Sequence, residues 1–104
     1  MNTDKAIQLV QRLKTLTNSN NVYYQPPESF KMNYPCIRLT RSSPSTDSAD
    51  NKRYRQMRGY DLIVIDPRPD NPWIDLLQDE FMYIQHMRHY TADNLNHDYF
   101  RLYF

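Results

Sequence analysis

Four consecutive apolar residues near the middle of the chain limit what this sequence can fold into. The segment at 62–65 reads Leu-Ile-Val-Ile. Successive side chains of a strand point to opposite faces, so this run predicts a strand whose end is covered on both sides. The stretch before it, Arg53 to Tyr60, is basic and rich in tyrosine, and we expect it to face solvent or a partner. The pattern therefore predicts a strand over residues 53–66.

Two segments show helical spacing of their apolar residues. Over residues 3–17 the apolar positions form a one-sided stripe, and the polar residues Asn18 to Asn21 end it. A second helix is expected from Pro72 to about His86, with Asn71 as its cap and proline at its first position. Its stripe comprises Ile74, Leu77, Phe81 and Ile84. Each one-sided stripe indicates a helix that lies on a sheet.

The remaining segments predict strands. Residues 36–41 alternate in character, with Ile37 and Leu39 directed to the core, and a short strand at 22–24 precedes them. Residues 87–92 and 98–104 predict a closing hairpin around a polar turn at 93–97. The expected order is helix, two strands, helix, two strands. It indicates an α+β fold with a mainly antiparallel sheet and two helices packed on one face.

One long polar segment interrupts this pattern. Residues 42–52 consist of serine, aspartate, asparagine, threonine, proline and lysine with a single alanine, and no periodicity survives there. We expect a mobile loop in a single domain that spans residues 1–104, because 104 residues leave no room for two cores.

Composition excludes several function classes. The net charge is +1, so bulk charge does not predict affinity for nucleic acid or membranes. The single cysteine, Cys36, rules out an internal disulfide and is interpreted as a small buried hydrophobe. Neither a signal peptide nor a membrane span is expected, which points to the reducing cytoplasm or a particle assembled there. With one glycine, the chain lacks a phosphate-binding loop, and we expect neither an enzyme nor a cofactor.

Histidines gather near the C-terminus and offer the best metal candidate. That set comprises His86, His89, His97, Asp93 and Asp98. Zinc needs three or four converging ligands, usually at fixed local spacings. No recognised spacing occurs here, so we interpret these histidines as surface residues and expect no metal.

A basic, tyrosine-containing run is the strongest candidate for a binding surface. Its members are Lys52, Arg53, Tyr54, Arg55, Arg58 and Tyr60. Arginine beside aromatic rings can hold nucleic acid, yet both residue types are also enriched at protein interfaces. We favour a protein interface, with nucleic-acid binding as the alternative. In the last strand, Tyr99, Arg101 and Tyr103 alternate with apolar residues and are expected to face a partner as well.

Three stretches of the chain resemble a known family. They are Val22-Tyr23-Tyr24-Gln25-Pro26-Pro27 running into Met32-Asn33-Tyr34-Pro35-Cys36-Ile37, then Tyr60-Asp61-Leu62-Ile63-Val64-Ile65-Asp66, and Tyr90-Thr91-Ala92-Asp93-Asn94-Leu95-Asn96-His97-Asp98. Together they resemble small neck proteins of tailed phages, the tail terminator or tail completion proteins. The resemblance covers residues 22–104.

The resemblance implies a virion structural protein without catalytic residues, assembled in the host cytoplasm. It would form a homo-oligomeric, hexameric ring that caps the tail tube and joins it to the head connector. Its partners would be other neck, tail-tube and connector proteins, with DNA close by in the channel and no membrane. A head–tail stopper or adaptor, or a tail-tube-associated protein, remains an alternative.

Overall fold

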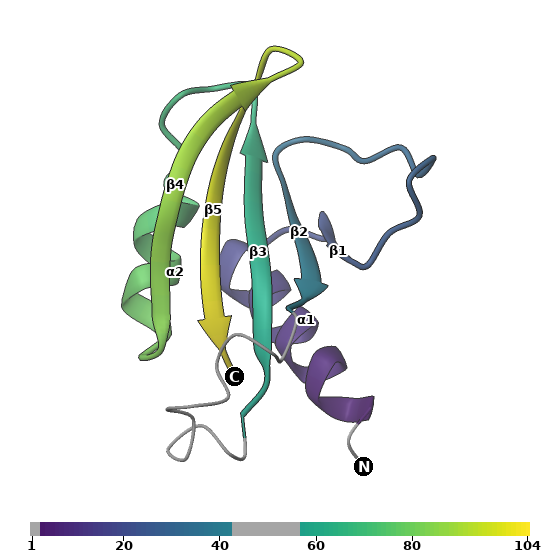
Figure 1. Cartoon of the computed structure of the whole chain (residues 1–104), viewed down its shortest axis with the longest axis vertical. Helices are drawn as coiled ribbons and strands as arrows, with labels where there is room; N and C mark the ends of the chain where they lie inside the picture. The colour runs from purple at the N-terminus through teal and green to yellow at the C-terminus, as the bar shows by residue number, and fades with distance from the viewer. Residues whose placement is uncertain (1–2, 43–56) are drawn as a thin grey trace.

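A five-stranded sheet organises the part of the chain that the computed structural model describes, residues 3–42 and 57–104 (Figure 1). The elements are α1 (Thr3–Thr17), β1 (Val22–Tyr24), β2 (Cys36–Arg41), β3 (Gly59–Asp66), α2 (Trp73–Glu80), β4 (Ile84–Ala92) and β5 (Leu95–Tyr103). The strand order is β1-β2-β3-β5-β4. Neighbouring strands are antiparallel except β1, which runs parallel to β2. The fold is α+β with a mostly antiparallel sheet, as the sequence predicts, but three strands lie between the two helices where the expected order has two.

The first helix has the predicted bounds. It ends where Asn18 takes a positive φ of 54°, a conformation that asparagine tolerates better than most residues. The Thr17 hydroxyl donates to the carbonyl of Leu13 at 2.8 Å, and the Ser19 N–H donates to the carbonyl of Lys14 at 3.2 Å. The bond to Lys14 satisfies one of the carbonyls that the end of a helix would otherwise leave without a donor.

The central strand is shorter than the sequence predicts. The expected strand began at residue 53, but β3 begins at Gly59, after the non-strand residues Met57 and Arg58. Residues 43–56 lie outside the described part of the chain, and so does most of the expected loop at 42–52. Ser42 is described and buried, and its N–H donates to the carbonyl of Gly59 at 3.0 Å.

The second helix is also shorter than predicted. Asn71 accepts the expected capping bond from the Trp73 N–H at 2.6 Å, and Pro72 already has helical dihedrals. The helix ends at Glu80, however, and Phe81 is extended with φ −108° and ψ 136°. β4 then starts at Ile84 instead of 87, so His86 lies in a strand. Ile84 fits the spacing of the helical stripe, but its pairing with Leu102 of β5 places it in the sheet.

The closing hairpin is tighter than predicted. Asp93 and Asn94 have φ values of 55° and 62° and form a two-residue turn, instead of the expected turn over 93–97. Positive φ at both central positions is the requirement of a type I′ hairpin turn. Consequently β5 begins at Leu95, and Ala92 pairs with it across the turn.

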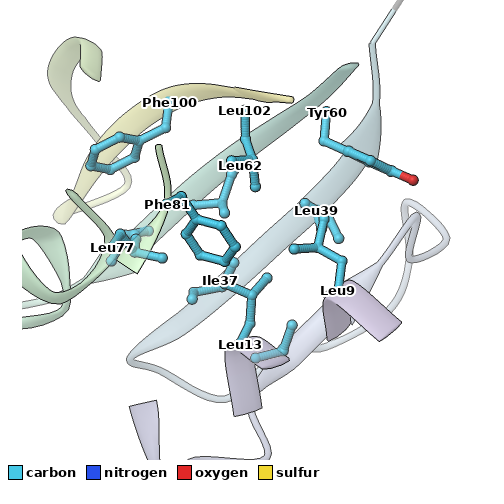
Figure 2. Close-up of a cluster of buried hydrophobic side chains, with 12 residues drawn as sticks. Leu9, Leu13, Ile37, Leu39, Tyr60, Leu62, Leu77, Phe81, Phe100 and Leu102 are labelled. Carbon is cyan, nitrogen blue, oxygen red and sulfur yellow. The ribbon is translucent and has the colours of Figure 1, made fainter. Parts of the chain in front are cut away.

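One cluster of buried side chains contains residues of the sheet and of both helices (Figure 2). Its residues from β2, β3 and β5 share one side of the sheet, which we call the apolar face: Ile37, Leu39, Tyr60, Leu62, Val64, Phe100 and Leu102. Leu9 and Leu13 of α1 and Leu77 of α2 belong to the same cluster and are fully buried. Neither described helix is long and apolar enough to cross a membrane.

Candidate interface surfaces

The side of the sheet opposite the apolar face carries a connected polar cluster. Asp61 lies opposite Arg101 in the register of β3 and β5, and Ile63 lies opposite Tyr99. We call this side the polar face. The Tyr99 hydroxyl donates to Asp61 Oδ1 at 2.7 Å, and Arg101 Nε donates to the same oxygen at 3.0 Å. Arg101 Nη2 also donates to the Tyr99 hydroxyl at 3.2 Å, which closes the triangle.

These three side chains hold each other in place while they stay partly exposed. The side chains of Asp61 and Arg101 retain 28% and 26% of their accessible surface. The hydrogen bond with the Tyr99 hydroxyl raises the pKa of Arg101, and the charge of Asp61 adds to this effect, so the guanidinium stays charged. A partner that meets this face would therefore find polar groups whose geometry is already set.

The polar face continues onto β4. The guanidinium of Arg88 lies 4.8 Å from the centre of the Tyr90 ring. Tyr90 stacks in turn on His97, with ring centroids 4.8 Å apart and an interplanar angle of 12°. This row of arginine and aromatic side chains is the composition that protein interfaces favour. Sequence reasoning placed Arg88 and Tyr90 in a strand but did not name them as interface candidates. Their positions two residues apart, on one side of that strand, were the signal that could have found them.

The structure divides the predicted interface residues among three locations. Tyr99 and Arg101 lie on the polar face, and so does Tyr103, which pairs with Gly59. Arg58 lies beside a groove described below. Tyr60 is 1% exposed and belongs to the apolar face, which corrects the expectation that it faces solvent or a partner. The remaining four, Lys52, Arg53, Tyr54 and Arg55, lie outside the described residues.

The burial of Tyr60 follows from strand parity. Its neighbour two positions along, Leu62, points to the core, and a period of two puts Tyr60 on the same side. Figure 2 shows its ring at the border of the cluster, with the hydroxyl directed away from it. Burial raises the pKa of Tyr60, and the nearby Arg58 and Arg41 pull it down.

A groove of about 550 Å³ opens beside that hydroxyl. Ala6, Ile7 and Val10 of α1 form one wall, and the opposite wall comprises Tyr24, Arg41, Arg58 and Tyr60. Ile7 is 57% exposed and Tyr24 39% exposed, so the apolar lining is open to solvent. Within the described part of the chain, no ion pair engages Arg41 or Arg58. The groove is thus an apolar surface with cationic groups at its border.

The histidines do not gather at one point. His86 Nε2 lies 2.9 Å from Asp98 Oδ1, while His89 Nε2 lies 3.1 Å from Asn96 Oδ1. His97 is held by its stack on Tyr90 and by a contact of 3.1 Å between Nδ1 and the carbonyl of Leu95. Within residues 3–42 and 57–104, no three His, Cys, Asp or Glu side chains converge as metal ligands.

Asp66 organises the turn between β3 and α2. It is 2% exposed and accepts hydrogen bonds from the Arg68 N–H at 2.9 Å and Asn71 Nδ2 at 2.7 Å. The Arg68 guanidinium adds an ion pair at 2.9 Å. Burial by itself would raise the pKa of Asp66, but the bonds from Arg68 and Asn71 outweigh it and hold the pKa below its usual value. This carboxylate has a structural role, because its acceptor capacity is taken up by the turn.

Cys36 is fully buried, as the sequence predicts. Burial raises the pKa of its thiol to about 12, and the charge of Arg38 only partly opposes this. The nucleophilic form of cysteine is the thiolate, so Cys36 is chemically inert near neutral pH.

Comparison with known proteins adds no relative: the chain matches no protein-family model, no curated protein and no solved structure.

Proposed function

We propose that this chain is a structural protein of the tailed-phage neck, a tail terminator that caps the tail tube and joins it to the head connector. It assembles in the host cytoplasm as a homo-oligomeric ring, and it works by binding other proteins instead of by catalysis. The three stretches that resemble neck proteins suggest this class, and the polar face is the structural observation that carries it.

The polar face suits a protein partner for two reasons. Tyrosine and arginine are the residues most enriched at the energetic centres of interfaces, and Tyr99, Arg101 and Tyr103 provide them on one strand. Tyr99 and Arg101 are also held by Asp61 before any partner arrives. Side chains that are already ordered lose less conformational entropy on binding.

Two observations support an arrangement with both helices on the apolar face. Leu9 and Leu13 of α1 share one buried cluster with Leu77 of α2, and Figure 1 draws both helices behind the sheet. In this arrangement the polar face is left for a neighbouring subunit, the tail tube or the connector.

The test is binding of the purified chain to purified phage tails that lack a terminator, followed by copy counting. We expect about six copies per tail end, and we expect Arg101→Ala to weaken binding about tenfold or more. Lys31→Ala, at an exposed position between β1 and β2, is the matched control and should bind like the wild type.

Other outcomes would redirect the proposal. Twelve copies bound to portal complexes would favour the adaptor alternative. A chain that ignores tails and connectors but binds DNA, with affinity that falls steeply as salt rises, would contradict the proposal and favour a nucleic-acid-binding protein.

A further inference from the structure

Two exposed surfaces on opposite flanks of α1 have complementary composition. The first is the groove lined by Ile7, Val10, Tyr24, Arg41 and Arg58. The second is the exposed side of α2 that carries Asp75, Leu76 and Asp79. We call it the α2 patch. Leu76 is 39% exposed.

The α2 patch is acidic, and its carboxylates have no ion-pair partner in the part of the chain that the structure describes. Helix α2 carries Asp75, Asp79 and Glu80, and it has no basic residue in its last turn. Glu80 is paired with Arg12 of α1 at 2.8 Å. Among the described residues no cation pairs with Asp75 or Asp79. Two acidic side chains and the apolar Leu76 therefore face outward together.

The groove has the opposite character. Its border carries Arg41 and Arg58, while Ile7 and Tyr24 provide exposed apolar surface. Large exposed apolar side chains that lie together usually mark a contact site, and Leu76 provides the apolar side chain of the α2 patch. Arginine on one surface and aspartate on the other give the charge complementarity that selects a partner.

The two surfaces cannot meet within one chain. Ile7 and Arg12 lie five residues apart on α1, which corresponds to about 140° around a helix of 3.6 residues per turn. Ile7 faces the groove, whereas Arg12 pairs with Glu80 of α2. In Figure 1, α2 accordingly lies at the left of the fold and the N-terminal turns of α1 at the lower right. A contact between the surfaces needs a second copy.

We infer that the groove of one copy receives the α2 patch of the next copy. The contact joins two different surfaces, so it repeats head to tail, and such a contact closes into a ring when the rotation per copy allows it. This inference rests on the proposed function and names the surfaces that would join the ring, while the polar face is left for the tail tube or connector.

Charge reversal tests the contact. We expect Arg58→Glu and Asp79→Arg each to weaken self-association about tenfold or more, measured by mass photometry and sedimentation over a concentration series. The matched controls Lys31→Glu and Glu28→Arg reverse exposed charges between β1 and β2 and should associate like the wild type. Circular dichroism checks that each variant folds, and Arg41→Glu is the second variant if Arg58→Glu does not.

A mixing experiment identifies the two surfaces as partners. In an equimolar mixture of Arg58→Glu and Asp79→Arg chains, each altered groove can receive an altered α2 patch and each native groove a native one. We expect association to return to within about threefold of the wild type, with the two variants alternating. The double variant should recover in the same way.

Several outcomes would overturn this inference. They are single variants that associate like the wild type, a mixture that stays dissociated, or a wild-type chain that remains monomeric up to about 1 mM. Tail binding is measured separately. If the chain binds tails but these tests fail, only the groove contact is wrong; if it ignores tails yet forms rings, the neck function is wrong and the contact stands.

Discussion

The two faces of the same sheet are built from adjacent residues but do different things. On the apolar face Leu62 and Phe100 are fully buried in a cluster that includes both helices. One position away, Asp61 and Tyr99 hydrogen-bond to each other on the polar face at 2.7 Å. The comparison teaches that one strand pair can place a buried core on one face and a hydrogen-bonded polar cluster on the other, so each can be altered with limited effect on the other.

The largest expected effect comes from a pair of truncations on β3. Leu62→Ala should lower the free energy of unfolding by about 3 kcal/mol, because it opens a cavity in the core. Ile63→Ala, on the adjacent but partly exposed position, should cost about 1 kcal/mol. Urea denaturation of the two variants measures both. Equal losses of unfolding free energy in the two variants would show that the two faces contribute alike to stability.

The second prediction concerns Asp66, the buried carboxylate at the end of β3. Asp66→Asn should lower the free energy of unfolding by about 2 kcal/mol near neutral pH, because the ion pair with Arg68 and its hydrogen bonds weaken. The folded-state pKa is depressed, so this contribution exists above the unfolded pKa of about 3.9 and is lost as pH falls through the folded pKa.

Denaturation curves of wild type and Asp66→Asn should therefore converge below about pH 4. Asp70→Asn is the control, because Asp70 is exposed in the same turn. A difference between wild type and Asp66→Asn that does not change with pH would mean that the charge of Asp66 contributes little.

The third prediction concerns Tyr99 on the polar face. Tyr99→Phe removes the hydroxyl that joins Asp61 and Arg101, and we expect it to cost about 1 kcal/mol of stability. Tail binding should fall more than this stability loss implies, because the polar cluster loses its fixed geometry. Tyr34→Phe, at an exposed tyrosine, is the matched control. Unchanged tail binding would remove the polar face from the proposed interface.

The smallest effect is expected at the only glycine. A Cβ at Gly59 would lie 2.5 Å from Ser42 Oγ, so that hydroxyl must rotate away. We expect Gly59→Ala to cost about 0.5 kcal/mol, because the lower entropy of the unfolded chain offsets part of the strain. In a double-mutant cycle Ser42→Ala should remove the cost, since its Cβ stays 3.8 Å away. Additive losses would show that the close approach does not matter.

Most of the elements could be predicted because their patterns are unambiguous. The stripe over Thr3–Thr17 has no competing period, and the alternation of residues 36–41 and 98–104 identifies strands with Ile37, Leu39, Phe100 and Leu102 inside. The errors fall where two patterns overlap. Phe81 and Ile84 fit a helical stripe, but they lie in extended chain because β4 pairs with β5 from Ile84 to Ala92, with one bulge between His86 and Arg88.

The candidate site was predicted in part. Tyr99, Arg101 and Tyr103 followed from the alternation of the last strand, which also decides their face. The basic neighbours of Tyr60 led to the prediction that it lies at the surface. It is two positions from Leu62 on the same strand, however, so strand alternation places both side chains in the core. The groove had no local signal, because its residues come from segments distant in the sequence.

By itself the sequence determined the α+β class, the first helix, the strand pattern and the burial of Cys36, since each depends on periodicity or composition within a short window. Only the tertiary structure decided the parallel pairing of β1 with β2, the end of α2 at Glu80 and the triangle of Asp61, Tyr99 and Arg101. Each of these depends on which strand lies beside which. Strand order is set by the summed burial and hydrogen bonding of the whole sheet, and no single segment carries that information.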